Sequence, residues 1–165
     1  MTGHNRLIFD TDGGIDDAQA LLLLIAAGRT PDAITTVFGN VEMETATRNM
    51  LATLAIAGVD VPVHMGAETP MTQPIVHAKH VHGEDGLGGA RRPDVTAEPA
   101  SDDAIGYLRK TFGEAAAMGE RVDILMIALA FVAANALISW IASIDLDTFI
   151  DELQSASLGW LLLAF

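Results

Sequence analysis

Four aspartates lie within eight residues between two apolar runs, and this arrangement constrains the fold more than any other feature of the chain. Residues 10–17 read D-T-D-G-G-I-D-D, after the apolar run 7–9 and before the apolar run 18–27. The pattern predicts a buried strand, a tight glycine turn and a helix. Like charges this close raise each other's pKa unless a cation compensates, and carboxylate oxygens are the ligands that Ca²⁺ prefers. Helix capping explains only the last two aspartates, so the segment is predicted to be a metal or catalytic site.

Apolar, β-branched runs alternate with segments of helical periodicity along the first 127 residues. The predicted strands are 7–9, 33–38, 61–64 and 122–127, and the predicted helices are 16–27, 42–57 and a third that is capped by 101–103 and ends near 118. Strands that alternate with helices predict an α/β fold with an open, mostly parallel sheet flanked by helices.

Polar or glycine-rich segments follow three of these strands. The aspartates of residues 10–17 follow the first strand, Gly39 and Asn40 follow the second, and the long Gly- and His-rich segment 66–99 follows the third. Ligands of open α/β sheets bind at the carboxyl ends of the strands. The three segments are therefore expected to meet at one edge of the sheet.

The composition limits the class of protein. A chain of 165 residues with 50% hydrophobic residues predicts a single packed domain, 1–165. The formal net charge of −13 argues against a nucleic-acid partner, because phosphate backbones require basic patches. Without cysteine there are no disulfides and no thiolate metal sites. The first residues lack the apolar core of a signal peptide, so a cytoplasmic protein is expected.

One apolar segment gives a competing interpretation. Residues 124–144 are apolar except for Asn135, Ser139 and Ser143, and they are numerous enough to span a bilayer. A membrane-associated protein anchored through this segment is therefore an alternative. The favoured interpretation is a buried strand, 122–127, followed by a buried helix at 131–141, because strands covered on both faces also read as continuous apolar runs.

Three motifs of the chain, in the same order, resemble those of the inosine–uridine-preferring nucleoside hydrolases. The family's D-x-D-P-G-x-D-D corresponds to residues 10–17, with Gly13 in place of the proline. Its V-x-G-N corresponds to 37–40, and the T-R-N of 47–49 is also typical of the family. Its H-x-H-G-x-x-G-x-G corresponds to 80–88. The resemblance covers about residues 6–128 and implies a nucleoside hydrolase-like α/β fold.

The resemblance implies hydrolysis of the N-glycosidic bond of ribonucleosides to a free base and ribose, with a calcium-bound water as the attacking group. Asp12 then acts as the general base and as a Ca²⁺ ligand, and Asp17 is a second Ca²⁺ ligand. Asp16 and Asn40 contact the ribose, and Asp10 supports the cluster. His82 lies near the nucleobase and takes a catalytic role.

The resemblance ends before the C-terminal part of the chain. The family's G-P-L-T-N is replaced by L-A-F-V-A-A-N at 129–135, and 129–165 is divergent. A shortened or divergent family member is therefore expected, with weaker calcium binding and slow turnover. The alternative is a catalytically weak or inactive calcium- or ribose-binding remnant of the fold. Apolar surface left uncovered by the missing half favours a homo-oligomer.

Overall fold

The computed structural model describes residues 6–118 and 121–126, which belong to one compact unit, Met1–Ala128. Its helices and strands follow one another as β1 (Arg6–Thr11), α1 (Ile15–Ala26), β2 (Ala33–Thr36), α2 (Met43–Ala57), β3 (Val63–Met65), α3 (Lys79–His82), α4 (Ala104–Met118) and β4 (Val122–Met126). The four predicted strands and three predicted helices are present. The short helix α3 interrupts the segment that was predicted to be a loop.

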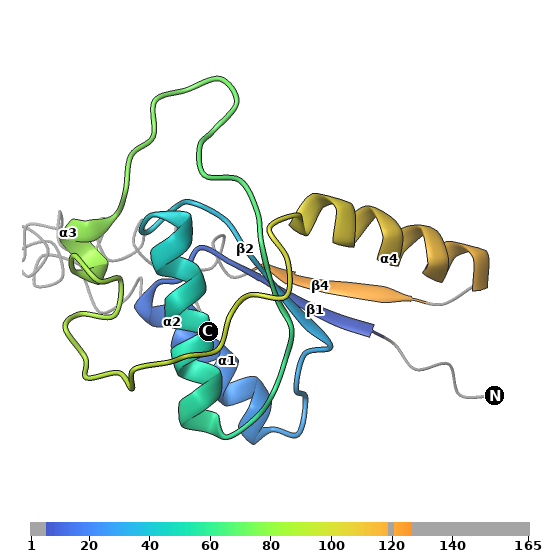
Figure 1. Ribbon diagram of the computed structural model, residues 1–165, viewed down its shortest axis with the longest axis horizontal. Coiled ribbons are helices and arrows are strands. Elements are labelled where there is room, and N and C mark those ends of the chain that lie inside the picture. Colours follow the sequence, from blue (N-terminus) through green and yellow to red (C-terminus); the bar gives the residue numbers. More distant parts are fainter. Residues whose placement is uncertain (1–5, 119–120, 127–165) are drawn as a thin grey trace, which may run out of the picture. The chain divides into compact units, whose positions relative to one another are not determined.

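The sheet is parallel and open, as predicted, with the strand order β3-β2-β1-β4. Strands β2 and β3 are added in turn on one side of β1, and β4 then pairs with the other side of β1. Right-handed crossovers therefore place α1 and α2 on one face of the sheet and α4 on the other, as Figure 1 shows. The strand order reverses at β1, and the carboxyl end of the strand at such a reversal is where α/β sheets bind ligands. Asp10 is the penultimate residue of β1.

Apolar side chains of β1, α1, β2, α2 and β3 form the core between the sheet and its helices. The fully or almost fully buried members of this core are Phe9, Leu21, Ile34, Met50, Leu51, Leu54, Val61 and Val63. Helix α2 contributes three of them at helical spacing. Helix α4 begins where expected, because Oδ1 of Asp103 accepts a hydrogen bond from the backbone N–H of Gly106 (2.8 Å). This packing fixes the strand ends from which the site is built.

The structure describes only the beginning of the long apolar run 124–144. Residues 124–126 are part of β4, which pairs with β1, so the predicted strand is present. Ile124 exposes 39% of its surface, which differs from the burial that was expected on both faces. No helix among residues 6–118 and 121–126 is long and apolar enough to cross a membrane. The helix predicted at 131–141 and the remainder of the candidate membrane segment lie outside the described residues. The same holds for much of the C-terminal part of the predicted single domain, 1–165.

Candidate functional site

The turn between β1 and α1 is held by its own side chains. Oγ1 of Thr11 accepts a hydrogen bond from the backbone N–H of Gly13 (3.0 Å). Oδ2 of Asp17 accepts one from the backbone N–H of Gly14 (2.8 Å), and Asp17 is only 2% exposed. Gly13 has a φ of 75°, which proline, with φ fixed near −65°, does not adopt. The glycine that replaces the motif's proline thus gives this turn a conformation of its own.

Asn40 joins the end of β2 to the aspartates after β1. Its backbone N–H donates to Oδ2 of Asp12 (2.9 Å), and its Nδ2 donates to Oδ1 of the same carboxylate (2.8 Å). The same Nδ2 lies 3.4 Å from Oδ2 of Asp17. Both oxygens of Asp12 are therefore fixed, and the carboxylates of Asp12 and Asp17 meet at one amide. The structure thus brings together Asp12, Asp17 and Asn40, which the sequence placed at one edge.

Burial and neighbouring negative charge raise the pKa of two of the aspartates, Asp10 and Asp17. Burial and then the charge of Asp12 raise the pKa of Asp17 to about 7, against the hydrogen bonds from Thr11 and Gly14 and with a smaller contribution from Asp16. Burial also raises the pKa of Asp10; its hydrogen bond from Thr35 opposes this, and the charge of Asp12 adds to it. Within the described residues, no lysine or arginine forms an ion pair with any of the four aspartates. The cluster is therefore short of positive charge.

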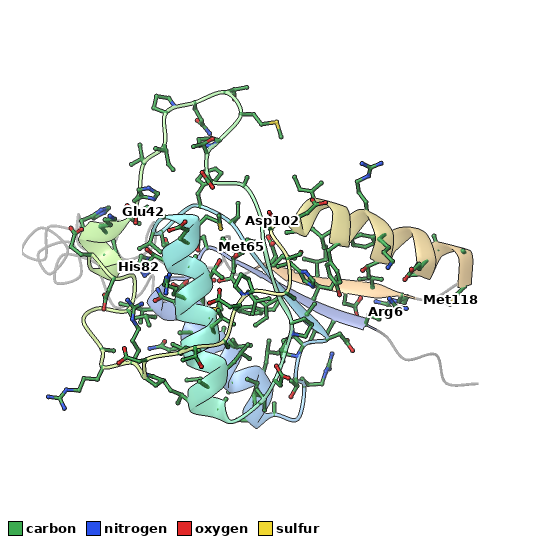
Figure 2. All side chains as sticks on the ribbon, in the orientation of Figure 1. Arg6, Glu42, Met65, His82, Asp102 and Met118 are labelled. Carbon is green, nitrogen blue, oxygen red and sulfur yellow. The ribbon has the colours of Figure 1, made fainter. Side chains whose placement is uncertain are left out.

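His82 lies at the end of α3 and packs against the same turn. Its side chain is 1% exposed, and its Nδ1 accepts a hydrogen bond from the backbone N–H of Ile15 (3.2 Å). The same nitrogen is 3.7 Å from Oδ1 of Asp16, whose side chain is 25% exposed. Helix α3 is held beside the start of α2, where Nζ of Lys79 lies 2.6 Å from Oε1 of Glu42 (Figure 2). His82 thus supports the turn from a buried position, a placement that the motif alone did not reveal.

The donor atoms of the site suit a hard cation. Asp12 and Asp17 present carboxylate oxygens next to each other, and burial and then the charge of Asp12 raise the pKa of Asp17. A cation bound there would relieve this repulsion. In the part of the chain that the structure describes, no three His, Asp or Glu side chains form a metal-binding group. Two carboxylates supply only part of the six to eight oxygens that Ca²⁺ takes.

The geometry of the site agrees with a comparison of the sequence with known protein families. The family model described as inosine-uridine preferring nucleoside hydrolase matches residues 7–138, which span most of the chain and include every residue of the site. The chain belongs to this family. The motif resemblance, which ended at about residue 128, is therefore confirmed and extends slightly further.

Individual relatives match a shorter segment. The non-specific ribonucleoside hydrolase RihC of Salmonella enteritidis is 41% identical over 110 residues, which are 66% of this chain and 36% of that protein. The RihC of Salmonella agona matches to the same extent. The chain thus spans about a third of the length of the curated relatives that it matches.

Solved structures give the same fold. The purine-preferring ribonucleoside hydrolase of Gardnerella vaginalis matches with a TM-score of 0.59 at 26% identity, over 67% of this chain and 37% of that one. The plant nucleoside hydrolase PpNRh1 matches with a TM-score of 0.57 at 36% identity, over 67% and 36% of the two chains. These matches confirm the predicted nucleoside hydrolase-like α/β fold.

The raised pKa of Asp17 predicts a pH-dependent stability in calcium-free buffer. Between its ordinary pKa of 3.8 and about 7, the folded chain holds a proton that the unfolded chain has lost. The contribution of Asp17 to the free energy of unfolding therefore falls as the pH rises through this window. Urea unfolding in EDTA should show this loss for the wild type and a flatter profile for Asp17→Asn. The exposed Asp60 provides the control: Asp60→Asn should keep the wild-type slope, and equal slopes in all three proteins would contradict the prediction.

Proposed function

We propose that this chain hydrolyses the N-glycosidic bond of ribonucleosides, releasing a free base and ribose. Water adds to the anomeric carbon of the ribose, the bond from that carbon to the base nitrogen breaks, and the base leaves with a proton. The observation that carries the proposal is the meeting of Asp12, Asp17 and Asn40 at the strand end where the sheet order reverses, in a chain of the nucleoside hydrolase family.

Asp12 is the proposed general base. Two hydrogen bonds from Asn40 hold its carboxylate in one orientation. The remaining lone pairs of the carboxylate therefore have a fixed direction and are free to accept a proton from water. Asp16, with a quarter of its side chain exposed, and Asn40 are the proposed contacts to ribose hydroxyls. Asp10 accepts a hydrogen bond from the hydroxyl of Thr35 on the neighbouring strand. It is proposed to support the other aspartates by adding negative charge that attracts the cation.

Asp12 and Asp17 are also the proposed ligands of Ca²⁺. When bound, such a cation supplies Lewis acidity that lowers the pKa of a coordinated water. The two carboxylates contribute the charge that attracts the ion, and Asn40 keeps them close to each other. The remaining oxygens of the shell are proposed to come from water and from the ribose hydroxyls.

His82 is proposed to act near the nucleobase. In the present conformation its imidazole is buried, and Nδ1 accepts a hydrogen bond from the backbone N–H of Ile15. Direct protonation of a departing base would require the segment that carries His82 to move. In this conformation the residue contributes by holding the turn before Asp16 and Asp17.

The setting of the protein is also part of the proposal. We propose the cytoplasm as its location. Leu22, Leu23 and Ile56 expose 38%, 71% and 60% of their surface on α1 and α2, which favours a homo-oligomer. A single-mass monomer in light scattering at micromolar concentration would contradict the oligomer.

A second candidate is calcium or ribose binding without turnover. It is favoured by the two-carboxylate ligand set of the described residues and by the burial of His82. Calorimetry would then detect Ca²⁺ binding while no ribose is released. The two candidates therefore differ in one measurement.

That measurement is a reducing-sugar assay on inosine, uridine and adenosine, with Ca²⁺ and with EDTA. The hydrolase proposal predicts ribose release in Ca²⁺ and a loss of at least about 10²-fold in EDTA, because a Lewis acid at the water is worth several kcal/mol. Restoring Ca²⁺ after EDTA should restore the rate, and this controls for irreversible unfolding. Binding of Ca²⁺ without release from any of the three nucleosides would overturn the hydrolase proposal in favour of the binding candidate.

A further inference from the structure

Asn49 on α2 connects two loops that are distant in sequence. Its side chain is completely buried. Its Nδ2 donates one hydrogen bond to the backbone carbonyl of Gly13 (2.9 Å) and another to that of Asp85 (2.8 Å). One amide group thus holds the aspartate turn after β1 and the segment after α3 against the same helix.

The orientation of the Asn49 amide is fixed by a third partner. Nη1 of Arg92 donates to Oδ1 of Asn49. An asparagine amide has two donors and one acceptor oxygen, and here every one of these groups is used. Because the guanidinium can only donate, it keeps the oxygen on its own side and directs the NH₂ toward the two carbonyls.

The segment held by Asn49 reaches the aspartate turn at a second point. His82 accepts the N–H of Ile15, and the carbonyl of His82 accepts the N–H of Gly88 (2.7 Å). Oδ1 of Asp85 accepts the backbone N–H groups of Leu87 and Gly89, both at 3.1 Å. Residues 82–89 are therefore linked to the aspartate turn both directly, through His82, and through Asn49.

We propose that Asn49 is a positioning residue: it fixes the turn that carries Asp12 and Asp17 by bonding the Gly13 carbonyl, with Arg92 as its orienting partner. This role rests on the proposed hydrolase function, since it concerns the geometry of those carboxylates. Fixing the Gly13 carbonyl also fixes the next peptide N–H, at Gly14, which donates to Asp17. This role explains why the T-R-N motif has asparagine at position 49. No other side chain of this size offers two donors and one acceptor.

The test compares Asn49→Asp with Leu54→Ala by hydrogen exchange and by kinetics. Aspartate keeps the shape and the Arg92 contact but replaces the two donors by an acceptor, which removes the partner of the buried Gly13 carbonyl and of the partly buried Asp85 carbonyl. Exchange of the Gly14 and Ile15 amides should accelerate at least about tenfold, while the Ile34 amide in β2 keeps its rate.

Leu54→Ala is the control: it removes core volume in the same helix and should accelerate exchange of the Ile34 amide at least as much as that of Gly14. Turnover of the Asn49→Asp protein should fall by about 10²-fold, the loss expected for a misplacement of about 1 Å, whereas folded Leu54→Ala protein keeps its rate.

Arg92→Met is the second variant, in case Asn49→Asp does not fold. It leaves the buried amide in place but removes its orienting partner, so the same two amides should accelerate by a smaller factor than in Asn49→Asp. Equal acceleration of Gly14 and Ile34, or none at Gly14, in whichever of the two variants folds would overturn the positioning role. If the wild type releases no ribose, the hydrolase proposal fails, and the exchange rates still decide the role of Asn49.

Discussion

Replacing Asp12 by asparagine is expected to lower nucleoside turnover by about 10²–10⁴-fold, the usual cost of losing a proton-transfer group. An amide cannot take the proton of the attacking water. The change also places an NH₂ group opposite one of the two N–H donors of Asn40, which now bond the carboxylate at 2.9 and 2.8 Å. One of those bonds is therefore lost. Calcium affinity should fall as well, because one of the two proposed charged ligands is removed.

The Asp12→Asn experiment needs a control for charge and a check on folding. Asp60 is exposed and precedes β3, at the opposite edge of the sheet, so Asp60→Asn makes the same charge change away from the site. Urea unfolding should show that Asp12→Asn remains folded, since losing a partly buried hydrogen bond costs about 1–3 kcal/mol. If Asp12→Asn and Asp60→Asn hydrolyse nucleosides equally well, the base that activates water is another residue.

Much of the fold could be predicted from the sequence because its signals are local. Apolar β-branched runs mark the four strands, and helical spacing marks α1, α2 and α4. Parallel strands all end at one edge, so residues that follow different strands were expected to converge. The contact of Asn40 with Asp12, between residues 28 positions apart, agrees with this expectation.

The remaining features depend on long-range packing, which leaves no periodic signal. His82 is buried because the segment after β3 folds back on the aspartate turn, through its bond to Ile15. Asn49 lies in the predicted helix 42–57 and in a family-like motif, yet its partners, Gly13 and Asp85, each lie 36 positions away. The four-residue helix α3 is shorter than any pattern can indicate. These features concern the loops, where sequence patterns are least informative.

Replacing Gly39 by alanine is expected to reduce turnover by about 10²-fold without removing any chemical group from the site. A Cβ at this position would lie 2.5 Å from Cβ of Asp12 and closer still to Oδ2 of the same residue. The carboxylate must then move by about 1 Å, and a misplacement of that size commonly costs about 10²-fold in rate. The two hydrogen bonds from Asn40 move with it or break, so calcium affinity should fall in the same protein. Gly39→Val should lose more than Gly39→Ala, because the larger side chain requires a larger displacement.

Gly113→Ala is the matched control for Gly39→Ala. Gly113 lies in α4, and among the described residues no neighbouring atom comes within 4 Å of the place that an alanine methyl would take. Alanine there should stabilise the helix by up to about 1 kcal/mol, and turnover and calcium affinity should equal those of the wild type. The graded loss across glycine, alanine and valine at position 39 tests geometry, whereas Asp12→Asn tests chemistry. If Gly39→Ala keeps both wild-type turnover and wild-type calcium affinity, the carboxylate of Asp12 does not act from the position that Asn40 now gives it.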